Sequence, residues 1–325
     1  MGSDRGGQGE VKHQVVHQAL SPLTGIALKV ISVAIFVGMS TSIKLAGQVP
    51  AGQIVFFRSF FAIFPILVFL AWQGELRTAV VTTRPFGHIM RGLAGVTAMG
   101  FSFFALTQLP LPEAITLNYA QPLLVVVFSA LILGENVRAY RWTAVAIGLV
   151  GVLIVSWPNL TLFTSPEGVS DKAAMGAVAA IVGAALSAIA MLLVRNLVHT
   201  ERTATIVLWF SLTASIMALF SIPFGWQSLT WEQTALLVTS GFCGGIAQLF
   251  MTEAYRHAEA STVAPFEYTS LLLGIVVGYL VFGDLPTLYT LVGGVIVVGA
   301  GIFIIWRERR LGIERQAAKK AAPPQ

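Results

Sequence analysis

Two polar runs interrupt strongly apolar sequence in this chain. Glu267-Tyr268 follows Pro265, and Asn118-Tyr119 precedes Pro122. A proline bends a helix and frees a backbone carbonyl, which is tolerated in apolar surroundings where the segment lines a cavity. The Glu267 carboxylate can carry a proton, bind a ligand or pair with a cation, and tyrosine hydroxyls away from water need a partner. We therefore predict a small-molecule site flanked by the two tyrosines, with a purely structural ion pair as the alternative for Glu267.

Cations in apolar sequence add to this candidate site. Lys44 and Arg58 fall at similar depth, about 10 Å below the same surface by helical rise. Together they would attract an anionic or carbonyl-rich group, and structural pairing of Arg58 with an acid or a carbonyl is the alternative. Lys29 lies within two turns of a helix end, so we expect its ammonium to snorkel to the interface. The candidate binding set is completed by Gln121, Gln248 and Phe101.

No motif for covalent chemistry accompanies these residues. The sequence has no nucleophile–base pair, no Gly-x-Ser-x-Gly run and no glycine-rich phosphate loop after a strand. It has no histidine pair at metal-ligand spacing, and its single cysteine, Cys243, lies in a run of small residues typical of packing. We predict no catalytic residue, no metal site and no cofactor, so an enzyme is not expected.

Composition indicates which elements must position these residues. Of the 325 residues, 56% are hydrophobic and only 11% are charged, whereas soluble proteins carry about a quarter charged residues. The composition therefore predicts an all-α integral membrane protein. A spanning helix needs about 20 mostly apolar residues, and ten such spans are predicted: 23–46, 51–72, 86–108, 112–134, 140–157, 173–194, 203–223, 233–256, 260–283 and 285–306.

The second half of the sequence repeats the first. Residues 105–157 align without a gap with 254–306, at an offset of 149. The offset pairs Tyr119 with Tyr268 and Asn118 with Glu267. Because each copy holds an odd number of spans, the second copy enters the membrane in the opposite sense. We predict two inverted five-helix repeats, and repeats of this kind place a binding site between the halves.

Lysine and arginine predict the orientation. With a cytoplasmic N-terminus the outer loops hold only Lys172, whereas the inner segments collect many cations. The predicted order is a cytoplasmic tail 1–22, a first repeat 23–157, a periplasmic linker 158–172, a second repeat 173–306 and a basic cytoplasmic tail 307–325. We therefore interpret the basic residues as topology signals and as contacts to anionic lipid, and not as a nucleic-acid site. The inner cations before the tail are Arg5, Lys12, Arg77, Arg84, Arg91, Arg138, Arg141, Arg195, Arg202 and Arg256.

Several motifs resemble a known family. The segments Pro112-Glu-Ala to Leu133-Gly-Glu135 and Phe282-Gly-Asp-Leu-Pro286, with the 5+5 repeat, resemble the ten-helix EamA-type members of the drug/metabolite transporter superfamily over about residues 23–306. Val55-Phe-Phe-Arg-Ser59 and His88-x-Met-Arg-Gly92 resemble bacterial riboflavin transporters. Phe56-Phe-Arg58 and Ala264-Pro-Phe266 also look like S-adenosylmethionine uptake proteins.

The resemblance implies a secondary transporter of the bacterial inner membrane that works by alternating access without an ATPase. We expect riboflavin uptake, with S-adenosylmethionine or other metabolite uptake and amino-acid or drug export as alternatives. A membrane receptor or scaffold is the alternative outside transport, and a homodimer is left open. The expected partners are a small-molecule substrate and the lipid bilayer.

Overall fold

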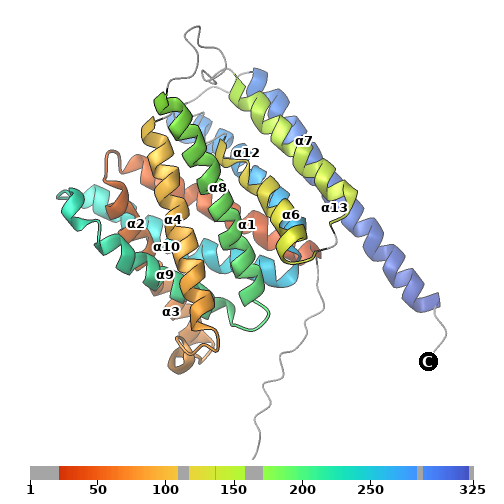
Figure 1. Cartoon of the computed structure of the whole chain (residues 1–325), viewed down its shortest axis with the longest axis horizontal. Helices are drawn as coiled ribbons and strands as arrows, with labels where there is room; N and C mark the ends of the chain where they lie inside the picture. Colours follow the sequence, from red (N-terminus) through yellow and green to blue (C-terminus); the bar gives the residue numbers. More distant parts are fainter. Residues whose placement is uncertain (1–21, 109–116, 136, 158–170, 284–287, 322–325) are drawn as a thin grey trace, which may run out of the picture.

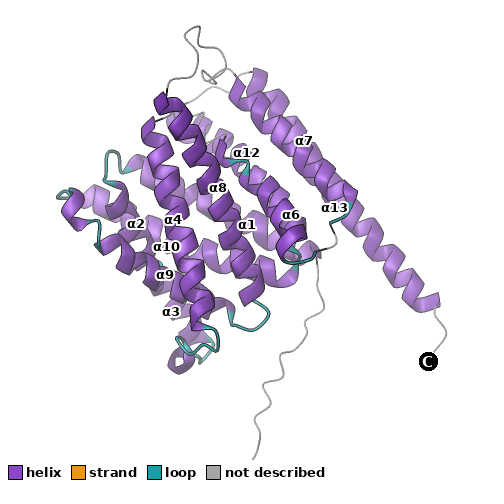
Figure 2. Cartoon of the chain, in the orientation of Figure 1, coloured by secondary structure: helices purple, strands orange, loops and turns teal. Residues whose placement is uncertain are grey.

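The computed structural model describes residues 22–108, 117–135, 137–157, 171–283 and 288–321. Every regular element in these ranges is a helix, which confirms the all-helical prediction for the described chain (Figure 2). The predicted N-terminal tail and linker, the Pro112-Glu-Ala start of the first motif and Asp284 to Pro286 of the second lie wholly or mostly outside the described residues. The helices are α1 Pro22–Leu45, α2 Ala51–Phe60, α3 Ile63–Trp72, α4 Pro85–Gln108, α6 Gln121–Ile132, α7 Ala139–Ser156, α8 Asp171–Leu197, α9 Thr203–Leu219, α10 Trp231–His257, α11 Ala260–Val263, α12 Thr269–Val277 and α13 Leu288–Ala321.

Five helical segments of the described chain are long and apolar enough to cross a membrane. Shorter apolar helices accompany them, among them α6 and α9. A multi-pass arrangement follows, because a buried apolar helix of this length satisfies its own backbone groups in lipid. The five segments are Pro22–Leu45, Ala51–Trp72, Lys172–Leu197, Trp231–His257 and Ala260–Val281.

The main helix pairings join the first half of the chain to the second. Helix α1 packs on α10, α4 on α8, α7 on α13 and α2 on α9. In Figure 1, α4 and α8 cross the front of the bundle side by side, while α7 and α13 run together along one edge. The two halves are therefore interleaved, and a group on one half faces a group on the other.

Small residues allow the close approaches. A Cβ built on Gly241 of α10 would lie 2.4 Å from the Phe61 Cβ, and one built on Gly245 would lie 2.6 Å from the Ala62 carbonyl oxygen. Such contacts are typical of helix packing in membranes. Phe61 and Ala62 also separate α2 from α3, so the segment predicted as the single span 51–72 is two helices in the structure.

The segment 260–283 is also interrupted. Its first turn, α11, continues into a 3-10 turn at Ala264–Tyr268, then α12, then a π-helical turn at Gly278–Phe282. Pro265 sits at the start of the 3-10 turn and cannot donate a backbone hydrogen bond. At the other end of the chain, α13 runs on as one helix to Ala321.

Candidate functional site

The centre of the candidate site is an ion pair between the two halves. The Lys29 ammonium of α1 donates a hydrogen bond to the Glu267 carboxylate in the 3-10 turn. The Lys29 side chain is 1% exposed and that of Glu267 is 30% exposed. The Tyr255 ring of α10 lies beneath the ammonium, 5.9 Å from the nitrogen to the ring centroid.

The expectation that Lys29 snorkels is therefore wrong. Its side chain lies on the face of α1 that is buried, together with Gly25, Ile26, Ser32 and Val33. That face packs against α10, where the Ser32 hydroxyl donates to the Ala247 carbonyl at 2.7 Å. A carboxylate within reach stabilises the buried ammonium, so the chain has no need to carry it to the interface. Among the described residues, Glu267 therefore pairs with Lys29 and not with Arg58.

The two tyrosines of the repeat contact each other directly. Their ring centroids are 5.9 Å apart, and the Tyr268 hydroxyl donates to the Tyr119 carbonyl at 3.3 Å. The Tyr119 hydroxyl lies 3.0 Å from the Ser270 hydroxyl, which in turn donates to the Glu267 carbonyl at 2.6 Å. A continuous hydrogen-bonded chain thus connects both tyrosines to the segment that holds Glu267.

Tyr268 is the more enclosed of the two. Its side chain is 1% exposed and packs with Val152 of α7 and Val297 of α13. A Cβ built on Gly148 would lie 2.6 Å from the ring, so the absence of a side chain there makes room for the tyrosine. Its ring faces α7 and α13, whereas Tyr119 is partly buried.

A second charged group consists of two arginines. Arg58 of α2 places Nη1 3.4 Å from the Met99 sulfur of α4. Arg91 of α4 is 3% exposed, and its guanidinium lies 4.0 Å from the centroid of the Phe210 ring. Within the described part of the chain, no carboxylate lies at ion-pair distance from either arginine, and the Arg91 Nε and Nη1 atoms have no hydrogen-bond partner.

The remaining predicted site residues are spread more widely. Gln248 is buried on α10, while Asn118 and Gln121 are partly buried at the start of α6. Lys44 is exposed at the end of α1, in contrast to the partly buried Arg58. The Phe101 ring is 38% exposed on α4.

A polar network joins the loop after α6 to the start of α11. The Glu135 carboxylate accepts hydrogen bonds from the backbone amides of Ala260 at 2.9 Å and Ser261 at 3.1 Å, and from the Ser261 hydroxyl at 2.8 Å. Arg195 lies 3.8 Å from the same carboxylate, and Arg141 pairs with Glu259. The network therefore fastens this end of the first half to the segment that leads to Glu267.

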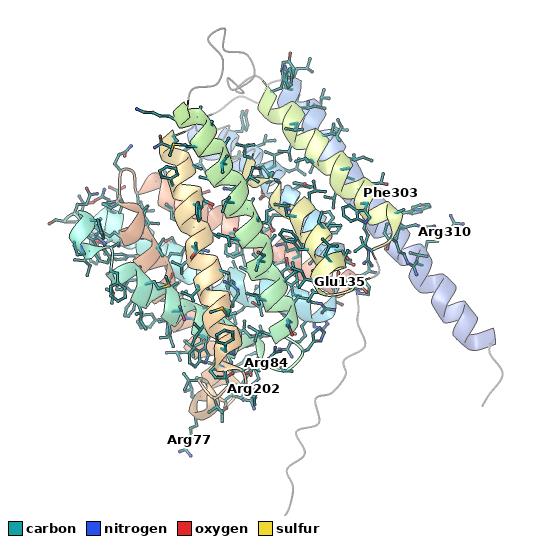
Figure 3. The ribbon with its side chains drawn as sticks, in the orientation of Figure 1. Arg77, Arg84, Glu135, Arg202, Phe303 and Arg310 are labelled. Carbon is teal, nitrogen blue, oxygen red and sulfur yellow. The ribbon has the colours of Figure 1, made fainter. Side chains whose placement is uncertain are left out.

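Glu201 organises a similar contact beside α9. Its carboxylate accepts from the Thr82 hydroxyl at 2.8 Å, the Thr83 amide at 3.0 Å and the Thr83 hydroxyl at 2.9 Å. Burial acts to raise the pKa of this carboxyl, but these hydrogen bonds and the nearby His88 outweigh burial and lower the pKa. Figure 3 shows Arg77, Arg84 and Arg202 gathered at this same end of the bundle.

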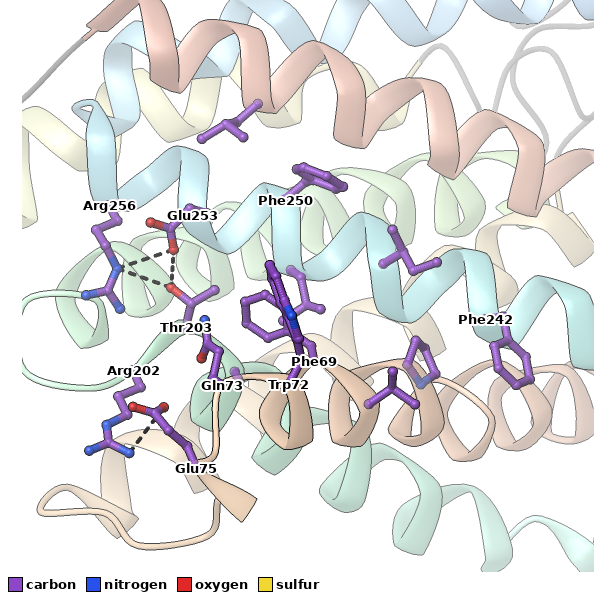
Figure 4. A pocket seen from close by; sticks show the side chains of 16 residues that line it. Phe69, Trp72, Gln73, Glu75, Arg202, Thr203, Phe242, Phe250, Glu253 and Arg256 are labelled. Atoms are coloured by element: carbon purple, nitrogen blue, oxygen red, sulfur yellow. Dashed lines mark hydrogen bonds and ion pairs between the residues drawn. The ribbon is translucent and has the colours of Figure 1, made fainter. Parts of the chain in front are cut away.

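A groove of about 910 Å³ lies between α3 and α10 (Figure 4). Its walls are largely apolar, with Phe69, Trp72, Phe242 and Phe250 among them. The cations that line it are paired: Arg202 lies 3.3 Å from Glu75, and Arg256 lies 3.5 Å from Glu253. Neither the Lys29 pair nor Arg58 and Arg91 line this groove, so we distinguish it from the candidate site.

Two members of the site were missed from the sequence. Lys29 was read as interfacial and Arg91 as a cation of an inner segment, whereas both are almost fully buried. For each residue, its position along its helix indicated that the side chain could be buried. Lys29 shares a face with small residues of α1, and Arg91 lies about 8 Å inside its predicted span by helical rise.

Comparisons with known proteins agree with this architecture. A solved crystal structure superposes with a TM-score of 0.76 over 90% of this chain and 99% of that chain, at 19% identity, which shows a shared fold. An S-adenosylmethionine uptake transporter of Rickettsia bellii is 30% identical over 79% of this chain and 84% of its own length. A riboflavin transporter of Rhizobium johnstonii is 29% identical over 93% and 94% of the two chains.

A pseudopaline exporter of Pseudomonas aeruginosa is 31% identical over 86% of this chain and 95% of its own length. The profile of the EamA-like transporter family matches residues 23–157 and 174–307, which is most of the chain and includes both charged groups of the site. The chain therefore belongs to the EamA-like transporter family.

Proposed function

We propose that the protein is a secondary transporter that moves a small organic metabolite across the bacterial inner membrane by alternating access. The observation that carries this proposal is the Lys29–Glu267 pair, which joins α1 of the first half to an interrupted helix of the second half. Charged groups inside a membrane protein mark substrate or ion pathways.

In the same proposal, ten spans form two inverted five-helix repeats with both termini in the cytoplasm. Helix pairing between the halves supports a repeat, since α1 with α10 mirrors α8 with α4. The gathering of Arg77, Arg84 and Arg202 at one end supports a cytoplasmic assignment for that end (Figure 3). The repeats would extend over 23–157 and 173–306, flanked by the tails 1–22 and 307–325 and joined by the periplasmic linker 158–172.

We assign the binding role to residues that face between the halves. Asn118, Tyr119, Gln121, Gln248 and Glu267 would supply polar contacts to the ligand. Tyr268 supports the site from behind, because its hydroxyl already donates to the Tyr119 carbonyl. For the ligand to leave toward the cytoplasm, the Glu135 and Glu201 networks would have to open.

Uptake of riboflavin and uptake of S-adenosylmethionine are the two substrate candidates, because relatives of similar identity carry each name. Export is the alternative direction, since a similar relative is named an exporter.

The experiment is uptake of labelled riboflavin and labelled S-adenosylmethionine into proteoliposomes. We expect saturable uptake of one compound and its loss in Glu267→Gln, which keeps a hydrogen-bond acceptor for Lys29. Glu232→Gln, the same change at an exposed position of α10, should transport normally. Uptake of either compound by Glu267→Gln at the wild-type rate would contradict the proposed role of this carboxylate.

A further inference from the structure

The four charged groups of the candidate site do not balance. Lys29, Arg58 and Arg91 contribute three positive charges and Glu267 contributes one negative charge, so the net charge is 3 − 1 = +2. The Lys29–Glu267 pair is neutral by itself, and the excess resides on the two arginines. An unpaired charge in a low-dielectric interior is strongly unfavourable. A stable protein that retains two such charges has a reason to keep them.

The two guanidinium groups lie close together along α4. A Cβ built on Gly95 would lie 2.5 Å from the Arg91 Nη1, so the Arg91 guanidinium sits beside Gly95, one turn beyond its own backbone. The Arg58 guanidinium contacts Met99, the residue one turn further. Four residues rise about 6 Å along a helix, so the two contacted positions, Gly95 and Met99, lie about that far apart on α4.

The two guanidinium groups suit a carboxylate ligand. Charge-assisted hydrogen bonds to a carboxylate are about 2.8 Å long, and its two oxygens can accept from two guanidinium groups that lie against neighbouring turns of one helix. The Arg91 guanidinium lies over the Phe210 ring, 4.0 Å from its centroid. Its Nε and Nη1 atoms are buried and have no hydrogen-bond partner in the described structure, so a ligand acceptor would satisfy donors that the protein leaves unsatisfied.

Resting on the proposed transport function, we infer that Arg58 and Arg91 bind a carboxylate of the substrate. The site thereby selects a carboxylate-bearing metabolite, such as one with an amino-acid moiety, over a neutral heterocycle. Riboflavin has no carboxylate, whereas S-adenosylmethionine has one, so the inference distinguishes the two candidate substrates. Lysine in place of arginine would keep the charge and lose the planar fork that fits a carboxylate.

The test uses a matched pair of probes on the purified full-length protein. S-adenosylmethionine and decarboxylated S-adenosylmethionine differ only in the carboxylate, and riboflavin serves as the neutral comparison. Binding is measured by calorimetry and by thermal stabilisation. We expect S-adenosylmethionine to bind about ten- to a hundred-fold more tightly than its decarboxylated analogue, the ratio for one or two charge-assisted hydrogen bonds.

Arg91→Gln and Arg58→Gln should each remove most of that ratio, and Arg91→Lys should restore part of it. Arg77→Gln, the same change on an exposed loop residue, should leave the ratio unchanged. Two single variants are included so that the result survives if one of them does not fold. Equal binding of the two S-adenosyl compounds by the wild type, or no binding of S-adenosylmethionine up to millimolar concentration, would overturn the inference.

The transport function is judged separately. Saturable riboflavin uptake that is unaffected by Arg58→Gln and Arg91→Gln would overturn the carboxylate inference and leave the proposed function intact. Failure to transport any of the three compounds, with no binding of them, would contradict both.

Discussion

Lys29 and Arg91 are both almost fully buried cations of the first half, but their surroundings differ. Lys29 meets a carboxylate from the second half, with an aromatic ring beneath it. Arg91 has the face of Phe210 and no carboxylate among the described residues. In the first arrangement the protein itself supplies the counter-charge, which also holds α1 against the interrupted helix. In the second, two buried N–H donors have no partner, so the two cations differ in whether the described protein compensates them.

We expect the largest effect on stability from removing the carboxylate that pairs with Lys29. Glu267→Leu leaves the ammonium buried without a carboxylate and should lower the free energy of unfolding by about 3 kcal/mol. The double variant Lys29→Met/Glu267→Leu should recover most of that loss, because it leaves no unpaired charge. Thermal melting in detergent measures both, and a double variant no more stable than the single one would show that the pair is not the source of stability.

Glu201 provides a second test, because hydrogen bonds stabilise the charge of this carboxylate outside the membrane-spanning segments. We expect its removal to lower the stability of the protein as well. Glu201→Gln should lower the free energy of unfolding by about 1.5 kcal/mol at neutral pH, since it weakens three hydrogen bonds to a charged acceptor. The pKa of Glu201 is lowered in the folded protein, so its contribution is present above the ordinary pKa of 4.5 and is lost as the pH falls through the folded value.

Melting temperatures of the wild type and Glu201→Gln, measured from pH 7 downward, should therefore converge in acid. A constant difference at all pH values would mean that the carboxylate charge has no part in this contact.

Arg91 should respond in the opposite direction and by the smallest amount. Arg91→Met removes an unpaired buried charge and keeps a long apolar side chain against Phe210. We expect the free energy of unfolding to rise by about 1 kcal/mol in the absence of substrate, as uncompensated polar groups are unfavourable in the interior. A marked loss of stability in the ligand-free protein would mean that Arg91 has a structural partner and would end its contrast with Lys29.

Helical architecture could be predicted because hydropathy determines it directly. Long apolar runs must form helices in lipid, and most predicted spans coincide with helices to within a few residues. The breaks within the predicted spans were harder to predict. Pro265 pointed to a break before Glu267. The separation of α2 and α3 at Phe61 and Ala62 was not predicted, although Pro65 cannot donate a hydrogen bond to the Phe61 carbonyl four residues earlier.

Only part of the candidate site could be predicted from the sequence, for a related reason. Glu267 could be singled out because a carboxylate deep in apolar sequence is rare. Its partner could not, since hydropathy gives the depth of a residue and not the direction in which it points. Arg58 and Lys29 were both available at the sequence level, and only the packing of α1 on α10 brings Lys29 to the carboxylate.

Each of the four charged groups of the site occurs in only one half of the chain, although the two halves contain equivalent helices. Helices α1 and α8 begin 149 residues apart, at Pro22 and Asp171, the same offset that relates the two tyrosines. Counting on by that offset, or back from Glu267, the positions equivalent to the four charged groups carry uncharged side chains: Val178, Val207, Ser240 and Asn118. In the proposed alternating-access cycle, two identical halves would give the two orientations equal energy. Charges that are present in one half and absent from the other remove that equality, so we expect the empty carrier of such a cycle to favour one orientation.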